Sequence, residues 1–100
     1  MTIRQKEKMK MLLRNCDIAY RHSGFELWFD VVDKLLENPD QNITNVYEKI
    51  ASERNATRIS IERNLRTSLL KGSPQVLLGQ TTKITNKEFA YALYYEIRGI

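Results

Sequence analysis

Hydrophobic residues recur along most of this chain at the spacing of an amphipathic α-helix, and no segment shows the alternation typical of a β-strand. The first hydrophobic face comprises Met9, Leu12, Leu13, Cys16 and Ala19. The sequence His22-Ser23-Gly24 interrupts this pattern. Ser23 and Glu26 then have the spacing of a capping box, which predicts that a second helix begins here.

Two further patterns predict the second and third helices. The second should bury Trp28, Val31, Val32, Leu35 and Leu36, and the third Ile43, Val46, Tyr47, Ile50 and Ala51. Asn38-Pro39-Asp40 should end the second helix, because proline cannot continue the helical hydrogen bonds. We expect the third helix to start near Asn42 or Thr44.

The remaining helices have recognisable ends. Thr57 is the predicted N-cap of a fourth helix that Gly72 ends, and residues 73–79 predict a short helical turn. Thr85 and Glu88 form a second capping box at the start of the last helix. That helix should bury Phe89, Ala90, Leu93, Tyr94 and Ile97.

These patterns predict an all-α fold, a compact bundle of five to six helices that forms a single domain over residues 1–100. The lone Cys16 cannot form an intramolecular disulfide, and we expect it to be a small apolar core residue. No stretch reaches the roughly 18 apolar residues of a membrane helix, and the N-terminus lacks the apolar region of a signal peptide. We therefore expect a cytoplasmic protein with no membrane partner.

Charge is unevenly distributed along the chain, although the net charge is only +4. Residues 1–14 and residues 54–71 each carry five basic side chains against one acidic side chain. Residues 25–40 carry five acidic side chains against one basic side chain. A basic face opposite an acidic one would orient the molecule toward a polyanion, and the alternative is a set of unrelated solvated faces.

The predicted fourth helix, TRISIERNLRTSLLKG at residues 57–72, has a polar side that faces away from its core stripe. It follows the third helix after a short turn, which predicts a helix-turn-helix over about residues 43–71, with the second helix in the DNA major groove. Arg63 and Arg66 suit the O6 and N7 atoms of guanine, and Glu62 suits the N4 amine of cytosine. Further candidates for base or phosphate contacts are Arg58, Ser60, Asn64 and Thr67.

Two readings of these side chains stay open. Glu62 and Arg66 could form an ordinary i, i+4 pair on a solvated helix. Ile59, near the polar side, could contact a thymine methyl group or pack beneath the turn. Phosphate contacts would come from the other bases, with the basic N-terminal helix as a further candidate.

The run from Ile43 to Leu69 resembles the DNA-binding effector domain of the stage zero sporulation protein A family, the response regulators that initiate sporulation. SGFELWFDVV at 23–32 is similar to the G-[FY]-x-[YF]-L helix start of this family, although Trp28 and Phe29 replace its aliphatic pair. TNKEFAYALYYEIR at 85–98 matches the family's T-N-x-E-F motif. The resemblance covers about residues 9–98.

This resemblance implies a six-helix, nucleoid-associated transcription regulator that recognises short promoter boxes in double-stranded DNA. Glu62, Arg63 and Arg66 match family positions that approach bases, whereas Ser60 and Thr67 stand where the family has an arginine and a histidine. A homodimer on DNA and the sigma subunit of RNA polymerase are two further candidate partners. The segment between the fourth and last helices, which serves both contacts in the family, is shorter here.

The family normally carries an N-terminal receiver domain that is phosphorylated on an aspartate, and this chain has no room for one. The chain is therefore either an isolated effector domain or a stand-alone relative.

Other functional classes fit the sequence less well. One histidine, one cysteine and no clustered carboxylates argue against an enzyme, and we expect no cofactor and no metal site. The main alternative is a protein-interaction module on a helix-turn-helix scaffold, which would use the acidic second helix and Tyr91, Tyr94 and Tyr95. Binding that weakens with salt and requires Arg63 would distinguish DNA recognition from this alternative.

Overall fold

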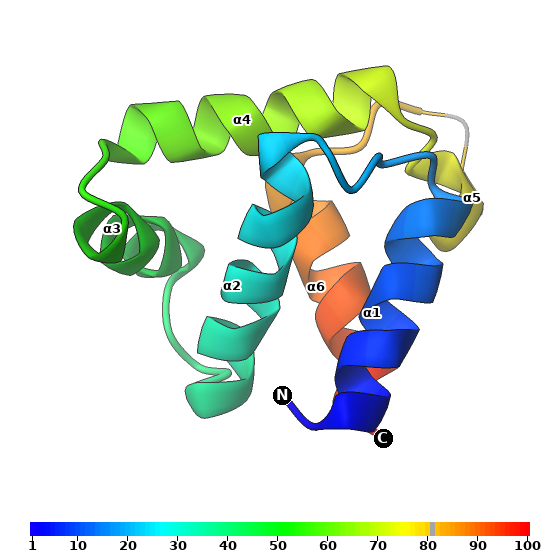
Figure 1. Ribbon diagram of the computed structural model, residues 1–100, viewed down its shortest axis with the longest axis horizontal. Coiled ribbons are helices and arrows are strands. Elements are labelled where there is room, and N and C mark those ends of the chain that lie inside the picture. The colour runs from blue at the N-terminus through cyan, green and yellow to red at the C-terminus, as the bar shows by residue number, and fades with distance from the viewer. Residues whose placement is uncertain (81) are drawn as a thin grey trace.

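The computed structural model describes residues 1–80 and 82–100. Its helices are α1 (Ile3–Asn15), α2 (Ser23–Glu37), α3 (Ile43–Glu53), α4 (Arg58–Lys71), α5 (Gln75–Leu78) and α6 (Asn86–Ile97), and the described residues contain no strand. This confirms the predicted helical bundle. In Figure 1, α4 lies across the top of the molecule above α1, α2 and α6, with α3 under one end and α5 under the other.

Each of the five longer helices begins after a residue whose side chain accepts a hydrogen bond from a backbone N–H in the first turn. Asn42 caps α3, and Thr57 caps α4, as predicted. Thr85 and Glu88 form the predicted capping box of α6. The backbone N–H and hydroxyl of Thr85 donate to the Glu88 carboxylate and hold its pKa below the ordinary value.

The predicted capping box of α2 is wrong. The N-cap is His22, whose Nδ1 accepts a hydrogen bond from the backbone N–H of Gly24 at 2.9 Å. Ser23 is the first helical residue, one position later than the cap. The ring nitrogen of His22 supplies the acceptor that the serine hydroxyl was expected to supply.

The end of α1 also differs from the prediction. The helix ends at Asn15, and Asp17 then has φ 56°, the left-handed conformation that often terminates a helix. This turn redirects the chain so that Ile18 is buried and Ala19 is exposed. Helical spacing therefore wrongly predicted that Ala19 lies in the core, where Ile18 lies instead.

The hydrophobic core has Trp28 among its fully buried side chains. The indole ring meets Phe89 edge to face with ring centroids 4.8 Å apart, and its Nε1 donates to the Ser68 hydroxyl at 2.9 Å. Leu36 and Ile43 lie only partly buried at the edge of the core. Apart from these two and the exposed alanine after α1, the residues predicted to be buried are buried, the lone cysteine included.

Two glycines mark the places where α4 closely approaches other elements. At Gly24 in α2, a Cβ atom would lie 2.7 Å from the Cβ of Ser68 in α4. At Gly72, a Cβ atom would lie 2.6 Å from the carbonyl oxygen of Cys16, which also accepts a hydrogen bond from the backbone N–H of Ser73 at 2.6 Å. These contacts bring α4 close to the start of α2 at Ser68 and close to the end of α1 at its own C-terminus.

Candidate nucleic-acid interface

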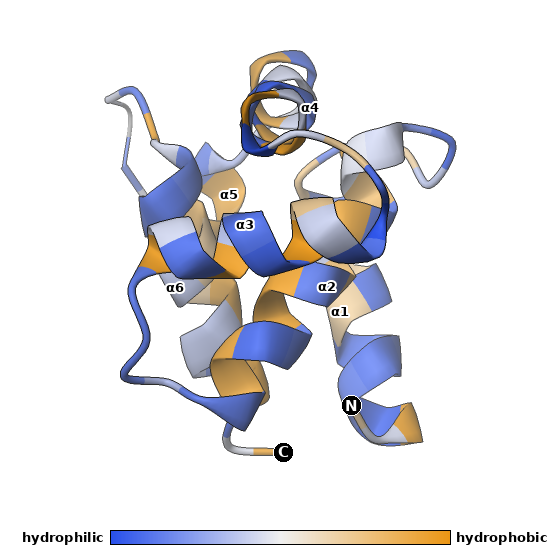
Figure 2. Cartoon of the chain, turned by 90° about the vertical axis from the view of Figure 1, so that its left-hand side faces the viewer, coloured by the Kyte–Doolittle hydropathy of each residue, from blue (hydrophilic) through white to orange (hydrophobic). Residues whose placement is uncertain are grey.

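The helix-turn-helix consists of α3, the turn at residues 54–57 and α4. Asn55 in this turn has φ 54°, a left-handed conformation that asparagine adopts more readily than most residues. Figure 2 shows α4 almost end-on, standing above α2 and α3. Its buried residues are Ile61, Leu65, Ser68 and Leu69, so the opposite side of the helix is open to solvent.

The exposed side of α4 carries a stripe of four residues at helical spacing, Ile59, Arg63, Arg66 and Leu70. All four side chains are exposed, and Ile59 retains 61% of its accessible surface. Ile59 therefore does not pack beneath the turn. In this stripe two forked hydrogen-bond donors lie between two apolar side chains, and these are the kinds of side chain that read guanine edges and thymine methyl groups.

Glu62 lies on a different side of α4 from Arg63. It is half-buried and lines a groove that α4 forms with α3 and α6, where its backbone carbonyl accepts a hydrogen bond from Asn86 Nδ2 at 3.0 Å. The ion pairs among the described residues do not include one between Glu62 and Arg66, so the simple i, i+4 pair is not formed. Arg66 borders both the groove and the exposed stripe.

The other candidate residues of α4 differ in how accessible they are. Arg58 is exposed at the first helical position. Ser60 is half-buried, and its hydroxyl donates a hydrogen bond to the carbonyl of Thr57 at 3.0 Å. The hydroxyl proton is therefore already engaged at the start of the helix. Asn64 and Thr67 are half-buried, and the backbone carbonyl of Asn64 lies close to Gly24 at the start of α2. Arg58 is therefore the most accessible of these four residues.

Ion pairs between α2 and the end of α3 change the charge distribution inferred from the sequence. Arg54 Nε lies 2.7 Å from a carboxylate oxygen of Asp30, and its guanidinium is 4.0 Å from Glu26. Lys34 Nζ pairs with Glu53 at 2.6 Å and its pKa is raised, chiefly by this hydrogen bond. The charge of Arg54 is therefore paired with the acidic side chains of α2. The other four bases of residues 54–71 are exposed and lie outside the described ion pairs.

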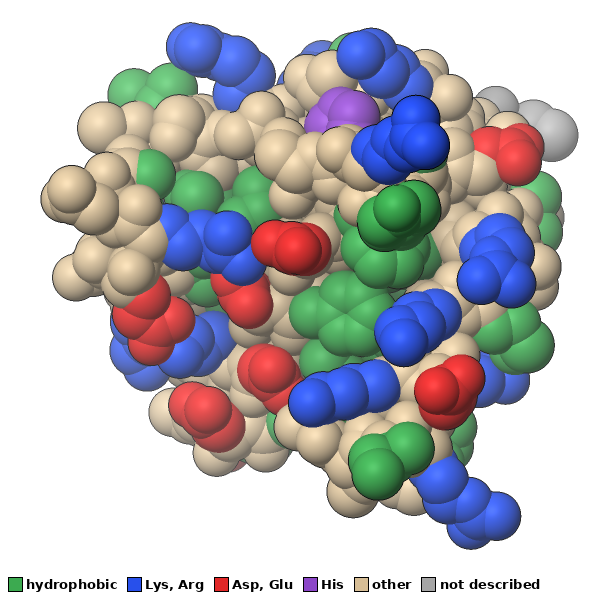
Figure 3. Space-filling model, in the orientation of Figure 1, with side chains coloured by type: hydrophobic (Ala, Val, Ile, Leu, Met, Phe, Trp, Pro, Cys, Tyr) green, Lys and Arg blue, Asp and Glu red, His purple; other side chains and the backbone are tan. Residues whose placement is uncertain are grey.

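The basic residues at the start of α1 do not lie beside α4. In Figure 1, α1 begins at the end of the molecule opposite α4, so its first half, which carries Lys6 and Lys8, points away from that helix. A duplex that lies along α4 would therefore be remote from this part of α1, and phosphate contacts from the start of α1 stay a prediction. Figure 3 shows basic side chains around a hydrophobic surface over α1 and α2, with acidic side chains gathered over α2.

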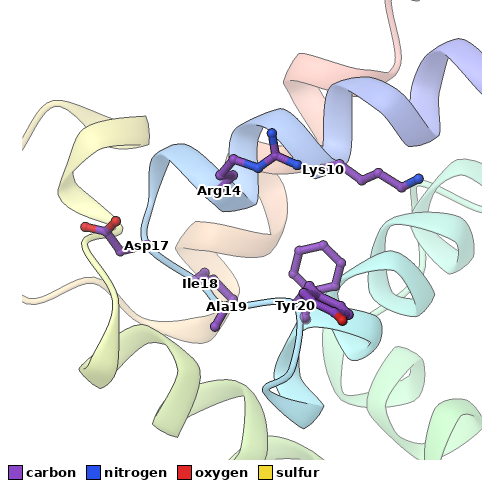
Figure 4. A pocket seen from close by; sticks show the side chains of 7 residues that line it. Lys10, Arg14, Asp17, Ile18, Ala19 and Tyr20 are labelled. Atoms are coloured by element: carbon purple, nitrogen blue, oxygen red, sulfur yellow. The ribbon is translucent and has the colours of Figure 1, made fainter.

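A hollow of about 430 Å³ lies between α1 and the loop before α2 (Figure 4). Lys10 and Arg14 project from α1, and Tyr20, 73% exposed, lies near the other side. The Tyr20 ring meets Phe25, which meets Phe29, with centroid separations of 6.4 Å and 5.4 Å. This aromatic cluster was not identified from the sequence. The i, i+4 spacing of Phe25 and Phe29, which brings two side chains together on one helix face, could have indicated it.

The protein-interaction alternative relies on three tyrosines of α6, and only one of them is exposed. Tyr94 is buried, Tyr91 is half-buried and Tyr95 is 58% exposed. The Arg98 guanidinium lies over the Tyr95 ring, 4.7 Å from its centroid, and covers part of it.

Two buried side-chain atoms lack a hydrogen-bond partner among the described residues, the hydroxyl oxygen of Tyr47 and Oδ1 of Asn86. Both residues line the groove between α3, α4 and α6. Tyr47 is only 4% exposed. Burial raises the pKa of its hydroxyl, and Glu62 and Tyr91 raise it further, so the hydroxyl stays protonated at neutral pH. The sequence assigned Tyr47 to the core and did not single out Asn86.

We expect Tyr47→Phe to raise the free energy of unfolding by about 1 kcal/mol, because it removes a buried hydroxyl without a partner and keeps the ring. Urea denaturation followed by tryptophan fluorescence measures this change. The control Tyr95→Phe removes an exposed hydroxyl and should change the free energy by less than about 0.5 kcal/mol. A clear loss of stability in Tyr47→Phe would contradict the assignment of an unpartnered hydroxyl.

The described residues contain no cluster of three histidine, cysteine, aspartate or glutamate side chains that could hold a metal ion. Over the same residues, no helix has the length and apolar character needed to cross a membrane. Comparison of the chain with protein-family models, curated proteins and solved structures gave no match. The resemblance to the sporulation effector domain therefore rests on residue patterns alone and stays a prediction.

Proposed function

We propose that this protein is a sequence-specific DNA-binding transcription regulator that inserts α4 into the major groove. The observation that carries this proposal is the exposed stripe of α4, in which Arg63 and Arg66 lie on the side opposite the core and outside the described ion pairs. Because α4 follows α3 after a short turn, this stripe occupies the place of the base-reading surface in a helix-turn-helix protein.

The charges of α4 support DNA as the ligand. The first turn contains no acidic residue, and Arg58 adds its charge to the positive end of the helix macrodipole. Glu62 is the only acid of the helix, and it lies in the groove rather than on the exposed stripe. An exposed helix with several unpaired cations attracts a polyanion, and phosphate contacts would supply most of its affinity.

The resemblance adds the biological setting of this proposal. The ligand is double-stranded promoter DNA in the nucleoid, bound without a cofactor, and the resemblance implies a regulator of the sporulation type. A second copy of the chain on DNA and the sigma subunit of RNA polymerase are the candidate protein partners. Ser60 and Thr67, which depart from the family motif, are the positions where the target box should differ from that of the family.

We expect Arg63→Ala to weaken binding to the preferred DNA site by about 1–3 kcal/mol, because it removes one forked contact to a base pair. The preferred site is first selected from random duplexes. Fluorescence anisotropy then compares that duplex with a scrambled one at about 50 and about 200 mM salt. The variant should lose most of its preference for the selected site, whereas binding to the scrambled duplex should fall much less.

The matched control is Lys6→Ala, which also removes one positive charge but lies in the half of α1 remote from α4. It should change either affinity by less than about twofold, the scale of screened long-range charge effects. Equal losses in the two variants would contradict base reading by α4. Failure of selection to enrich any sequence, together with salt-insensitive binding to a protein, would favour the protein-interaction module.

A further inference from the structure

A row of aromatic side chains runs from the loop before α2 along that helix. Tyr20 meets Phe25 with ring centroids 6.4 Å apart, and Phe25 meets Phe29 with centroids 5.4 Å apart. Tyr20 is exposed, and the two phenylalanines are half-buried. The row begins in the hollow between α1 and this loop and continues beyond it, because Phe29 lies one turn further along α2. The apolar surface is therefore elongated, which favours an extended ligand over a compact one.

Basic side chains of α1 follow one side of this aromatic row. Lys6, Lys10 and Arg14 are spaced four residues apart, so they lie on one face of α1 over about 12 Å. All three are exposed, and the ion pairs among the described residues include none of them. Lys10 and Arg14 line the hollow, and Figure 4 shows them on the α1 side of it with Tyr20 opposite. These three bases form a basic border along the aromatic row.

The neighbouring acidic side chains have partners of their own. Asp17 also lines the hollow, but its carboxylate accepts a hydrogen bond from the Ser73 hydroxyl at 3.3 Å and points away from the tyrosine in Figure 4. On α2, Glu26 and Asp30 directly follow the two phenylalanines, and Arg54 lies 4.0 Å and 2.7 Å from their carboxylates. A phosphate chain over the rings would meet these carboxylates. A peptide can present different charges to the two sides of the row, so the surface suits a peptide better than a nucleic acid.

We propose that the aromatic row and its basic border bind an acidic amphipathic segment of a partner protein. A large apolar side chain of the partner enters the hollow, whose volume of about 430 Å³ lies in the range of pockets that hold small ligands. Acidic side chains of the partner face Lys10 and Arg14, and its apolar side lies on the phenylalanines. This surface does not depend on DNA binding, because none of the described residues that line the hollow belongs to the exposed stripe of α4.

The test begins with a selection of displayed random peptides on the full chain. We expect enriched sequences that combine aspartate or glutamate with aromatic or large aliphatic residues. One enriched peptide is then synthesised and titrated into the full chain labelled with ¹⁵N. Saturable NMR shifts should centre on residues 6–14 and 18–29. A copy of the peptide in which amides replace the acidic side chains should bind at least about fivefold more weakly, because it loses several ion pairs.

Charge reversal on the chain tests the basic border directly. Lys10→Glu with Arg14→Glu should weaken the acidic peptide at least about tenfold, because like charges then face each other. The same double variant should gain affinity for a copy of the peptide in which lysines replace the acidic residues. The matched control is Lys83→Glu with Lys87→Glu, two exposed bases of the same spacing outside the hollow. At about 150 mM salt it should change the affinity by less than about twofold.

A further variant tests the aromatic row. Tyr20→Ala removes an exposed ring and should weaken the peptide at least about fivefold, the effect of losing one aromatic anchor. Far-UV circular dichroism checks that each variant keeps its helices.

The proposal is overturned if selection enriches nothing, if the enriched sequences lack acidic residues, or if the two double variants weaken binding equally. Shifts centred away from residues 6–29 would also overturn it. The other candidate occupants are tested in the same spectra. Shifts at the aromatic row on concentrating the free chain would identify a second copy as the occupant. Binding of single-stranded oligothymidylate at the row more tightly than the peptide would identify a nucleic acid.

Discussion

Replacing Trp28 with alanine should lower the free energy of unfolding by about 3–5 kcal/mol, the usual cost of deleting a buried aromatic side chain. Trp28 is fully buried, packs edge to face on Phe89 and donates a hydrogen bond to Ser68. Its loss would remove the aromatic contact with Phe89 of α6 and the hydrogen bond to Ser68 of α4. Urea denaturation followed by far-UV circular dichroism measures the change without requiring the tryptophan signal.

The effect is large compared with the total stability of a domain of this size, about 5–15 kcal/mol. The melting temperature should fall by roughly 4–8 °C for each kcal/mol lost. Trp28→Phe is the matched variant, because it keeps an aromatic ring beside Phe89 and removes the indole donor. It should cost clearly less than the alanine substitution. Equal losses would show that the hydrogen bond to Ser68, rather than packing, dominates at this position.

Gly72→Ala should lower the free energy of unfolding by about 1–3 kcal/mol, the usual cost of forcing an extra methyl group into a packed site. The added Cβ would lie 2.6 Å from the carbonyl oxygen of Cys16, a backbone atom that cannot rotate away. Gly72 has φ −101°, which alanine adopts without strain, so the cost arises from space alone. Chemical denaturation compares the variant with the parent chain.

Gly99→Ala is the control for this substitution, because a Cβ at Gly99 would have no atom within 4 Å. It should leave stability within about 0.5 kcal/mol of the parent. If Gly72→Ala were as stable as Gly99→Ala, the contact between the end of α4 and the end of α1 would be looser than described.

Helical spacing and capping residues predicted most of the fold, because both act within a few residues of sequence. Thr57 and Thr85 marked the starts of α4 and α6 correctly. The errors lie in the segment between α1 and α2, where Asp17 adopts a left-handed conformation and His22 replaces the expected serine cap. Residue spacing specifies neither a left-handed aspartate nor a histidine N-cap, so the sequence pattern could not predict either feature.

The candidate interface was predictable only in outline. The sequence identified α4 as the exposed helix, but it did not show that Glu62 lies in a groove or that Arg54 pairs with Asp30. Both arrangements depend on contacts between residues far apart in the chain, such as Asn86 with Glu62, which are 24 positions apart. Such contacts follow from how the helices pack, and that packing has no local pattern in the sequence.

The buried cysteine at the junction of α1 and α4 makes the chain a reporter of its own opening. Cys16 is 1% exposed, and burial raises the pKa of its thiol, so the reactive thiolate is scarce in the folded state. A thiol reagent therefore reacts at a rate set by how often the structure around Cys16 opens. Because the chain has one cysteine, each molecule takes up a single label. Labelling kinetics thus time the opening of the structure around Cys16 without any engineered probe.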